Sequence, residues 1–194
     1  MPSRSLPAML ASIALLCAGV TGMASGQEIA LDLDPARTTV QFTLGASLHS
    51  VHGSFKLKRG AIRFDPATGK IGGEAVVDAT SGESGSDGRD RRMHDGILES
   101  ARYPDIVFVP DRVEGSVARQ GASQVEVHGR FRIHGAEHEV MLPVQVQMTQ
   151  TAEGQAIAKI HFTIPYVKWG LKNPSTLFLR VSDKVDIDIA AYKR

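Results

Sequence analysis

The chain has 194 residues, of which 42% are hydrophobic and 22% are charged, and its 22 basic and 21 acidic side chains leave a formal charge of +1. This composition is that of a globular protein and excludes a chain that is disordered throughout. The small net charge and the 6% aromatic content exclude a broad phosphate-binding surface and a stacking platform, so we expect no nucleic-acid partner. The length suits a single domain.

The first 26 residues differ from the rest of the chain. Arg4 is their only charged residue, an apolar run occupies 6–20, and mostly small residues follow. This order is typical of a secretory signal peptide, and the run is shorter than the ~20 residues that a membrane span needs. We therefore predict a signal peptide over 1–26, a single domain over 27–194, and a periplasmic or secreted location. No stable membrane span is expected after the signal is removed.

Apolar and polar residues alternate through much of the predicted domain. The clearest stretches are 39–44, 124–133, 140–148, 160–164 and 185–189. A period of two predicts strands with one dry and one wet face, and this clean form favours antiparallel sheets. Turn-forming residues at 65–69 and 134–136 separate further strands, so that we expect about eight in total.

A single helix is predicted near the middle of the chain. Asp87 is placed to cap it, and Met93, Ile97 and Leu98 form an apolar stripe that ends before Tyr103. Many strands and one helix predict a closed barrel or a sandwich, and closure removes the exposed strand edges. An eight-stranded barrel is either filled by its own side chains or holds one small ligand. The sequence leaves both alternatives open.

Several segments resemble the YceI-like family, which is described as lipid- or polyisoprenoid-binding. They are SVHGSF (50–55), GAIRFDPATG (60–69), SARYPDIVF (100–108), VHGRFRIHGAEHEVMLPV (127–144), WGLKNPS (169–175) and VSDKVDIDI (181–189). The resemblance implies an all-β fold, a single antiparallel lipocalin-like β-barrel of about eight strands with one short helix over one mouth. It also implies export and an apolar interior that holds a long isoprenoid or fatty chain.

Such a ligand offers little but hydrocarbon, so the residues that bind it are expected to be apolar. From the inward phase of the alternation, we assign to the ligand site Phe42, Leu44, Phe55, Phe108, Phe131, Phe162 and Phe178. Met93 and Ile97 are added from the helix, and Trp169 from a late loop. The alternative for each of them is plain core packing.

A basic cluster lies at the predicted start of the helix, formed by Arg89, Arg91 and Arg92. Arg91 and Arg92 are candidates to pair with a diphosphate or carboxylate head group at the rim of the barrel. The alternative is a solvated helix face whose arginines pair with nearby aspartates.

Motifs for enzyme chemistry are not found in the sequence. It contains no G-x-S-x-G elbow, no HExxH and no cysteine-based metal spacing. His49 and His52 are three residues apart, a spacing that places them on opposite faces of a strand. We therefore predict no catalytic residues, no metal site and no cofactor, apart from a bound isoprenoid lipid as ligand.

Together these observations predict an exported, non-enzymatic binding protein. Its expected partner is an apolar long-chain lipid or an isoprenoid quinone, and a homodimer is left open. Two alternatives are a stress-protective or protein-interaction module with a filled barrel, and an enzyme that acts on a small apolar molecule.

Overall fold

The computed structural model describes residues 28–118, 120–150 and 156–194. The predicted signal peptide, 1–26, lies outside the described residues. The strands are β1 (Ile29–Asp32), β2 (Thr39–Leu44), β3 (Val51–Phe64), β4 (Ile71–Glu83), β5 (Asp105–Glu114), β6 (Gly121–Ile133), β7 (Ala136–Gln150), β8 (Ala156–Ile164) and β9 (Val185–Tyr192). A helix of two parts, α1 (Asp87–Arg91) and η1 (Arg92–Leu98), follows β4. No described helix is long and apolar enough to cross a membrane.

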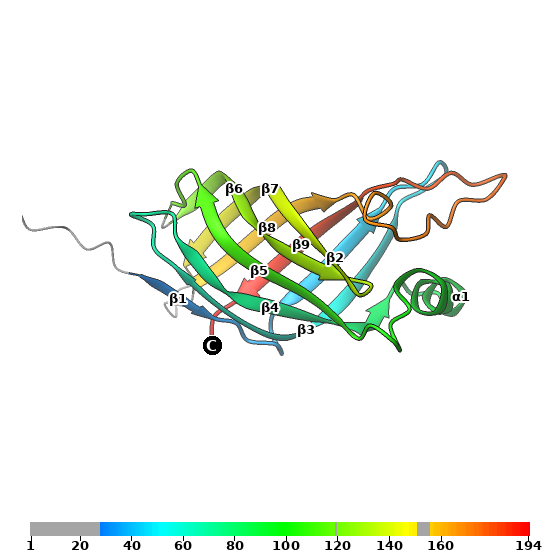
Figure 1. Cartoon of the computed structure of the whole chain (residues 1–194), viewed down its shortest axis with the longest axis horizontal. Helices are drawn as coiled ribbons and strands as arrows, with labels where there is room; N and C mark the ends of the chain where they lie inside the picture. Colours follow the sequence, from blue (N-terminus) through cyan, green and yellow to red (C-terminus); the bar gives the residue numbers. More distant parts are fainter. Residues whose placement is uncertain (1–27, 119, 151–155) are drawn as a thin grey trace, which may run out of the picture.

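The strands form one antiparallel sheet that closes on itself (Figure 1). Eight strands make the barrel in the order β3-β2-β9-β8-β7-β6-β5-β4, and pairing of β3 with β4 completes it. The 14 residues of β3 are long enough to pair with β2 over 51–56 and with β1 over 61–64. The predicted all-β antiparallel barrel of about eight strands with one short helix is therefore confirmed.

The β6–β7 hairpin shows how local sequence positions the walls. Ile133 pairs with Ala136, so only His134 and Gly135 form the turn, and both have positive φ. Two such residues make a turn whose twist matches that of the flanking strands. The Tyr103 ring packs edge-on against the His134 ring, with their centroids 5.0 Å apart. This contact connects the hairpin to the segment that follows the helix.

The helix lies at one end of the barrel (Figure 1). Its first residues are α-helical, whereas 92–98 form a π-helix. The N-cap is Ser86, which makes no side-chain capping bond, so Asp87 is not the cap that the sequence predicted. Asp90 instead accepts hydrogen bonds from the Ser84 N–H (2.9 Å) and hydroxyl (2.5 Å). These bonds tie the first helical turn to the end of β4.

His94 fastens the helix to the barrel wall. Its Nε2 lies 2.8 Å from the Gly82 carbonyl oxygen, which requires an N–H there. The resulting tautomer leaves Nδ1 to accept the Ser100 hydroxyl proton at 2.9 Å. The Glu99 N–H then donates to the His94 carbonyl, and Glu99 ends the helix with a φ of 46°. The helix is thus held over this end of the barrel by bonds at both of its termini.

Buried residues form two clusters along the barrel. One contains Phe64, Val113, Val125, Leu142 and Val144. The other lies toward the helix and contains Leu98, Phe131, Ile133, Tyr166 and Leu171. The first cluster consists of inward strand side chains, as in the burial pattern of β6. The second combines Phe131 and Ile133 of β6 with residues from the helix and from the loop after β8.

Candidate functional site

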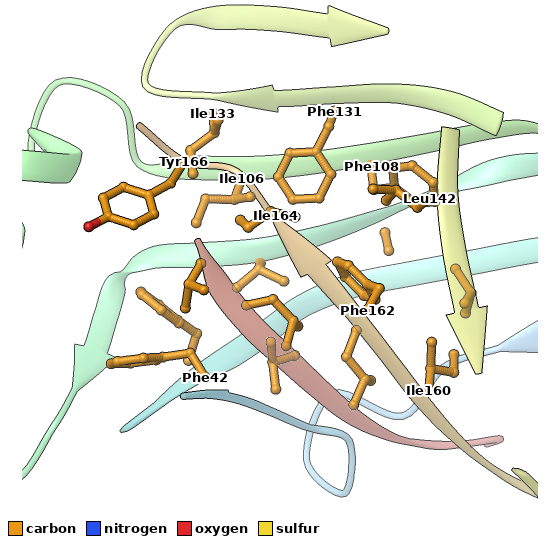
Figure 2. A pocket seen from close by; sticks show the side chains of 18 of the residues that line it. Phe42, Ile106, Phe108, Phe131, Ile133, Leu142, Ile160, Phe162, Ile164 and Tyr166 are labelled. Carbon is orange, nitrogen blue, oxygen red and sulfur yellow. The ribbon is translucent and has the colours of Figure 1, made fainter. Parts of the chain in front are cut away.

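The barrel encloses a cavity of about 580 Å³, a volume within the usual range for small-molecule sites. All nine strands and η1 contribute to its lining, which is almost entirely apolar. Figure 2 shows Phe42, Phe131 and Phe162 directed into the same space from different strands. The protein's own side chains therefore do not fill the barrel, in contrast to the packed-core alternative.

Most of the apolar residues assigned from the sequence line this cavity. Eight of the ten do so: Phe42, Leu44, Phe55, Met93, Ile97, Phe108, Phe131 and Phe162. The strand residues reach it because alternate side chains of a barrel strand point inward. Met93 and Ile97 reach it because η1 lies across the barrel end with these two side chains toward the opening.

Phe178 and Trp169 do not line the cavity, so the structure does not bring these two together with the other assigned residues. Phe178 lies in the loop between β8 and β9 and is 93% exposed. The two-residue period of a strand does not predict the direction of a side chain in a loop. Trp169 lies in the same loop and stacks on His138, with ring centroids 4.8 Å apart and planes 9° apart. The Trp169 ring also packs against Phe131, at 5.2 Å between centroids. Trp169 is thus one layer behind the cavity wall.

Two glycines make room for aromatic rings in the wall. A Cβ on Gly53 would collide with the ring of Phe42, and one on Gly82 would collide with Phe55 and Met93. The rings of Phe42 and Phe55 pack at 5.5 Å between centroids. Phe108 and Phe131 make a similar pair at 5.8 Å. These tilted pairs hold the rings in place without closing the space between them.

Polar side chains gather where the cavity meets the helix. Ser84, Arg89, Arg92 and His49 line this part, whereas Arg91 does not. Arg89 is engaged, since it donates to the hydroxyl (3.2 Å) and carbonyl oxygens (3.0 Å) of Ser84. The side chain of Arg92 makes no hydrogen bond or ion pair with another described residue. Of the two head-group candidates, the structure therefore places only Arg92 at the cavity.

Sequence reasoning missed Tyr166, which is 6% exposed and lines the cavity just beyond the end of β8. No periodicity marks it, because it follows the strand. Its hydroxyl donates to the Ser182 carbonyl at 2.7 Å and so connects the two ends of the loop between β8 and β9. Burial, and to a smaller extent the charge of Asp183, raises the pKa of Tyr166 to about 12.

This raised pKa predicts a loss of stability at alkaline pH. The unfolded phenol titrates near 10.0, so above that pH the folded state holds a proton that the unfolded state has lost. The stabilisation is complete below pH 10.0 and disappears as the pH rises through about 12. Tyr166→Phe should remove this dependence and cost up to about 1 kcal/mol at neutral pH, because the Ser182 carbonyl loses the shorter of its two side-chain hydrogen bonds and keeps only the one from the Asn173 amide at 3.3 Å. Urea unfolding of both proteins at about pH 8 and pH 11.5 measures the difference. Parallel losses in the two proteins would contradict the assignment.

One group of potential metal ligands occurs among the described residues. It consists of Glu114, Glu126 and His128, whose ligand atoms lie within 4.8 Å of one another. None of the three lines the cavity, and Arg112 donates to Glu114 at 2.9 Å. The guanidinium thus already neutralises the carboxylate on which a cation would depend.

Comparison with solved structures identifies proteins that have a similar fold. Similar solved structures include BcnA of Burkholderia cenocepacia, with 18% identity and a TM-score of 0.67 over 84% of this chain and 100% of that one. A polyisoprenoid binding domain from Saccharophagus degradans, implicated in plant cell wall breakdown, shows 17% identity and a TM-score of 0.57 over 84% and 97%. The YCEI protein of Campylobacter jejuni shows 19% identity and a TM-score of 0.56 over 74% and 85%. A search of the curated proteins found no match.

These likenesses concern the fold, since every identity is below 20%. The sequence itself matches the family model described as the YceI-like domain over residues 31–192. This match spans the end of β1, all of β2 to β9, and the helix that carries Met93 and Ile97. The chain therefore belongs to the YceI-like domain family.

Proposed function

We propose that this protein is an exported, non-enzymatic carrier that holds the chain of an isoprenoid or similar long-chain lipid inside its barrel. The observation that carries the proposal is the unfilled apolar cavity, which runs from Ile29 and Val117 at one end to Met93 and Ile97 at the other. A hydrocarbon chain gains about 25 cal/mol for each Å² that it buries. A long, dry space therefore selects a long, apolar ligand.

Two further observations support the proposal. A related fold is that of the Saccharophagus degradans domain described as polyisoprenoid binding. The cavity also has a polar end, at Arg92 and His49, which suits an amphiphile with its chain inside and its head group at the helix. The apolar lining supports carriage without catalysis, because hydrocarbon contacts bind a chain and do not activate a bond. The signal peptide expected over 1–26 supports export.

Native mass spectrometry of the protein purified without detergent tests carriage. A co-purifying mass in the lipid range is expected. After delipidation, titration with an isoprenoid quinone should quench the fluorescence of Trp169, the single tryptophan of the chain, because this ring packs on Phe131 of the cavity wall. Absence of both a co-purifying lipid and quenching would show that the protein is not a carrier of such lipids.

The head-group end allows a matched comparison of two neighbouring arginines. Arg92→Glu should weaken binding of geranylgeranyl diphosphate by about tenfold, the value of one charge-assisted contact, and should leave binding of uncharged geranylgeraniol unchanged. Arg91→Glu makes the same charge change on a side chain that does not line the cavity and should affect neither ligand. Competition of each ligand with an isoprenoid quinone, followed by the quenching of Trp169 fluorescence, measures both affinities. Equal affinities of all three proteins for the diphosphate would remove Arg92 from the head-group site.

A further inference from the structure

Two loops project together beyond the helix end of the barrel (Figure 1). They are 45–50, between β2 and β3, and 165–184, between β8 and β9. Ala46 and Val181 form a β-bridge. The Ser47 N–H donates to the Arg180 carbonyl, and the Ser182 N–H to the Gly45 carbonyl. We call these two connected loops the mouth loops.

The mouth loops expose apolar side chains at their tips. Among the described residues, four large hydrophobic side chains are exposed, and three of them belong to these loops: Leu177 (97%), Phe178 (93%) and Leu48 (80%). The fourth, Met141, lies on the outer wall of β7. Large apolar side chains gathered in this way mark an interaction surface rather than the scattered exposure common on soluble proteins.

The longer tip is held by hydrogen bonds. The Thr176 N–H donates to the Leu179 carbonyl at 2.9 Å, and the Leu179 N–H donates to the Thr176 hydroxyl at 3.2 Å. These bonds close a turn around Leu177 and Phe178. The Val181 N–H donates to the Ser175 hydroxyl and fastens the base of the turn. Both apolar side chains are therefore presented outward by the backbone.

Positive charge surrounds these tips. The loop 165–184 contains four basic residues, Lys168, Lys172, Arg180 and Lys184, against a single acid, Asp183. None of the four forms an ion pair with another described residue, and all four are exposed. The whole chain carries a charge of only +1, so this excess is a local feature of one end. The net charge of the whole chain, from which we expected no broad phosphate-binding surface, does not reveal it.

The same loop forms part of the cavity. Pro174, Leu179 and Val181 line it, although Leu177 and Phe178 between them face solvent. One short segment thus connects an exposed apolar tip with the interior of the barrel. A surface that received the tip would lie next to the opening at Met93 and Ile97.

We propose that the mouth loops dock this end of the barrel onto an anionic membrane surface. Leu48, Leu177 and Phe178 enter the boundary between head groups and acyl chains, and the basic side chains contact anionic head groups. The charge pattern favours a membrane over an apolar protein partner, because anionic lipids neutralise the basic residues while the tips leave water. Membrane docking does not require a bound lipid. Only the exchange of a lipid between bilayer and cavity rests on the proposed function.

Vesicle co-sedimentation tests the proposal. The full protein should bind vesicles of phosphatidylcholine with phosphatidylglycerol, bind weakly to phosphatidylcholine alone, and lose affinity as salt rises. Leu177→Asp with Phe178→Asp should reduce partitioning at least about tenfold. Lys172→Glu with Arg180→Glu should abolish the preference for anionic vesicles. Met141→Asp, which alters the remaining exposed apolar side chain, should bind as the unaltered protein does.

Several results would overturn docking. They are absence of sedimentation with anionic vesicles, equal partitioning of the tip variant, and equal loss in Met141→Asp. Light scattering in solution supplies a separate check, because conversion of a dimer to a monomer by the tip substitutions would assign the surface to a second copy of this chain. Circular dichroism must show that each variant is folded.

A cargo experiment separates this proposal from the proposed function. The tip variant should still bind an isoprenoid quinone added from solution, as measured by Trp169 quenching, but should extract it from anionic vesicles at least about tenfold more slowly. Vesicle binding without any quinone uptake would overturn carriage and leave docking intact. Quinone uptake without vesicle binding would overturn docking and leave carriage intact.

Discussion

Ala75→Phe combined with Ala158→Phe is expected to abolish lipid binding while the barrel stays folded. Both alanines line the cavity, on β4 and β8. Ala75 is opposite Phe108 on β5, and Ala158 is opposite Met148 on β7. The added rings enter a space that no side chain occupies, so the overpacking cost of about 1–3 kcal/mol that a filled core imposes should be small here.

The binding loss follows from the wall area that a ligand can no longer reach. Displacing a chain from about 200 Å² of apolar wall costs about 5 kcal/mol at 25 cal/mol per Å². The affinity for an isoprenoid quinone should therefore fall more than about a hundredfold. Quenching of Trp169 measures it, and the variants introduce no second tryptophan.

The neighbouring residues provide a matched control. Glu74→Phe with Lys159→Phe adds the same two rings one position away, where strand geometry directs them to the outer face. Neither residue lines the cavity. This control should bind the quinone with unchanged affinity. Equal binding by the inward and outward variants would show that the ligand does not occupy the barrel.

Phe131→Ala is expected to cost about 3 kcal/mol of unfolding free energy, the lower end of the range for buried phenylalanines. The ring is only 7% exposed and contacts both Phe108 and Trp169. We expect the lower end because one face of the Phe131 ring already borders the cavity, so that removing the ring loses contacts only on its other sides. Trp169 emission should shift to longer wavelength as water gains access to the indole.

Ligand should reverse part of this loss. A lipid that binds the folded state at a hundredfold excess over its Kd stabilises it by about 2.7 kcal/mol. Phe178→Ala removes the same ring from a side chain that is 93% exposed and should change stability by less than about 0.5 kcal/mol. Urea unfolding with and without quinone measures all of these values. A Phe131→Ala cost as small as that of Phe178→Ala would show that the wall is not packed as described.

Whether a residue assigned from the alternation lines the cavity depends on whether it lies in a strand. Phe42, Phe131 and Phe162 were assigned correctly to the inner face because the side-chain period of a strand is two whatever the surrounding fold. Phe178 has the same residue type but lies in a loop, where neighbouring residues carry no information about direction. Trp169 was assigned from a late loop, and its stacking partner, His138, comes from β7 and is 31 positions away in the sequence.

The helix also shows which features the local sequence predicts and which depend on the tertiary structure. Its stripe of Met93, Ile97 and Leu98 was visible in the sequence. All three line the cavity, although only Met93 and Ile97 were assigned to the ligand site. Arg91 and Arg92 could not be separated, because adjacent helical residues differ by about 100° in direction and the orientation of the helix depends on the bonds of His94 to Gly82 and Ser100. These bonds join residues whose proximity no local pattern reveals.

By itself, the amino-acid sequence determined most of the strands, their dry faces, the antiparallel class and the family, because these depend on local alternation and on the order of short segments. Only the tertiary structure decided that the barrel is hollow, which arginine reaches the cavity, and that Leu48 and Phe178 project from the same end. The physical reason is that a cavity or a surface patch is formed jointly by side chains from segments that are far apart in the sequence. Their volume and position depend on closure and packing, which no single stretch of sequence encodes.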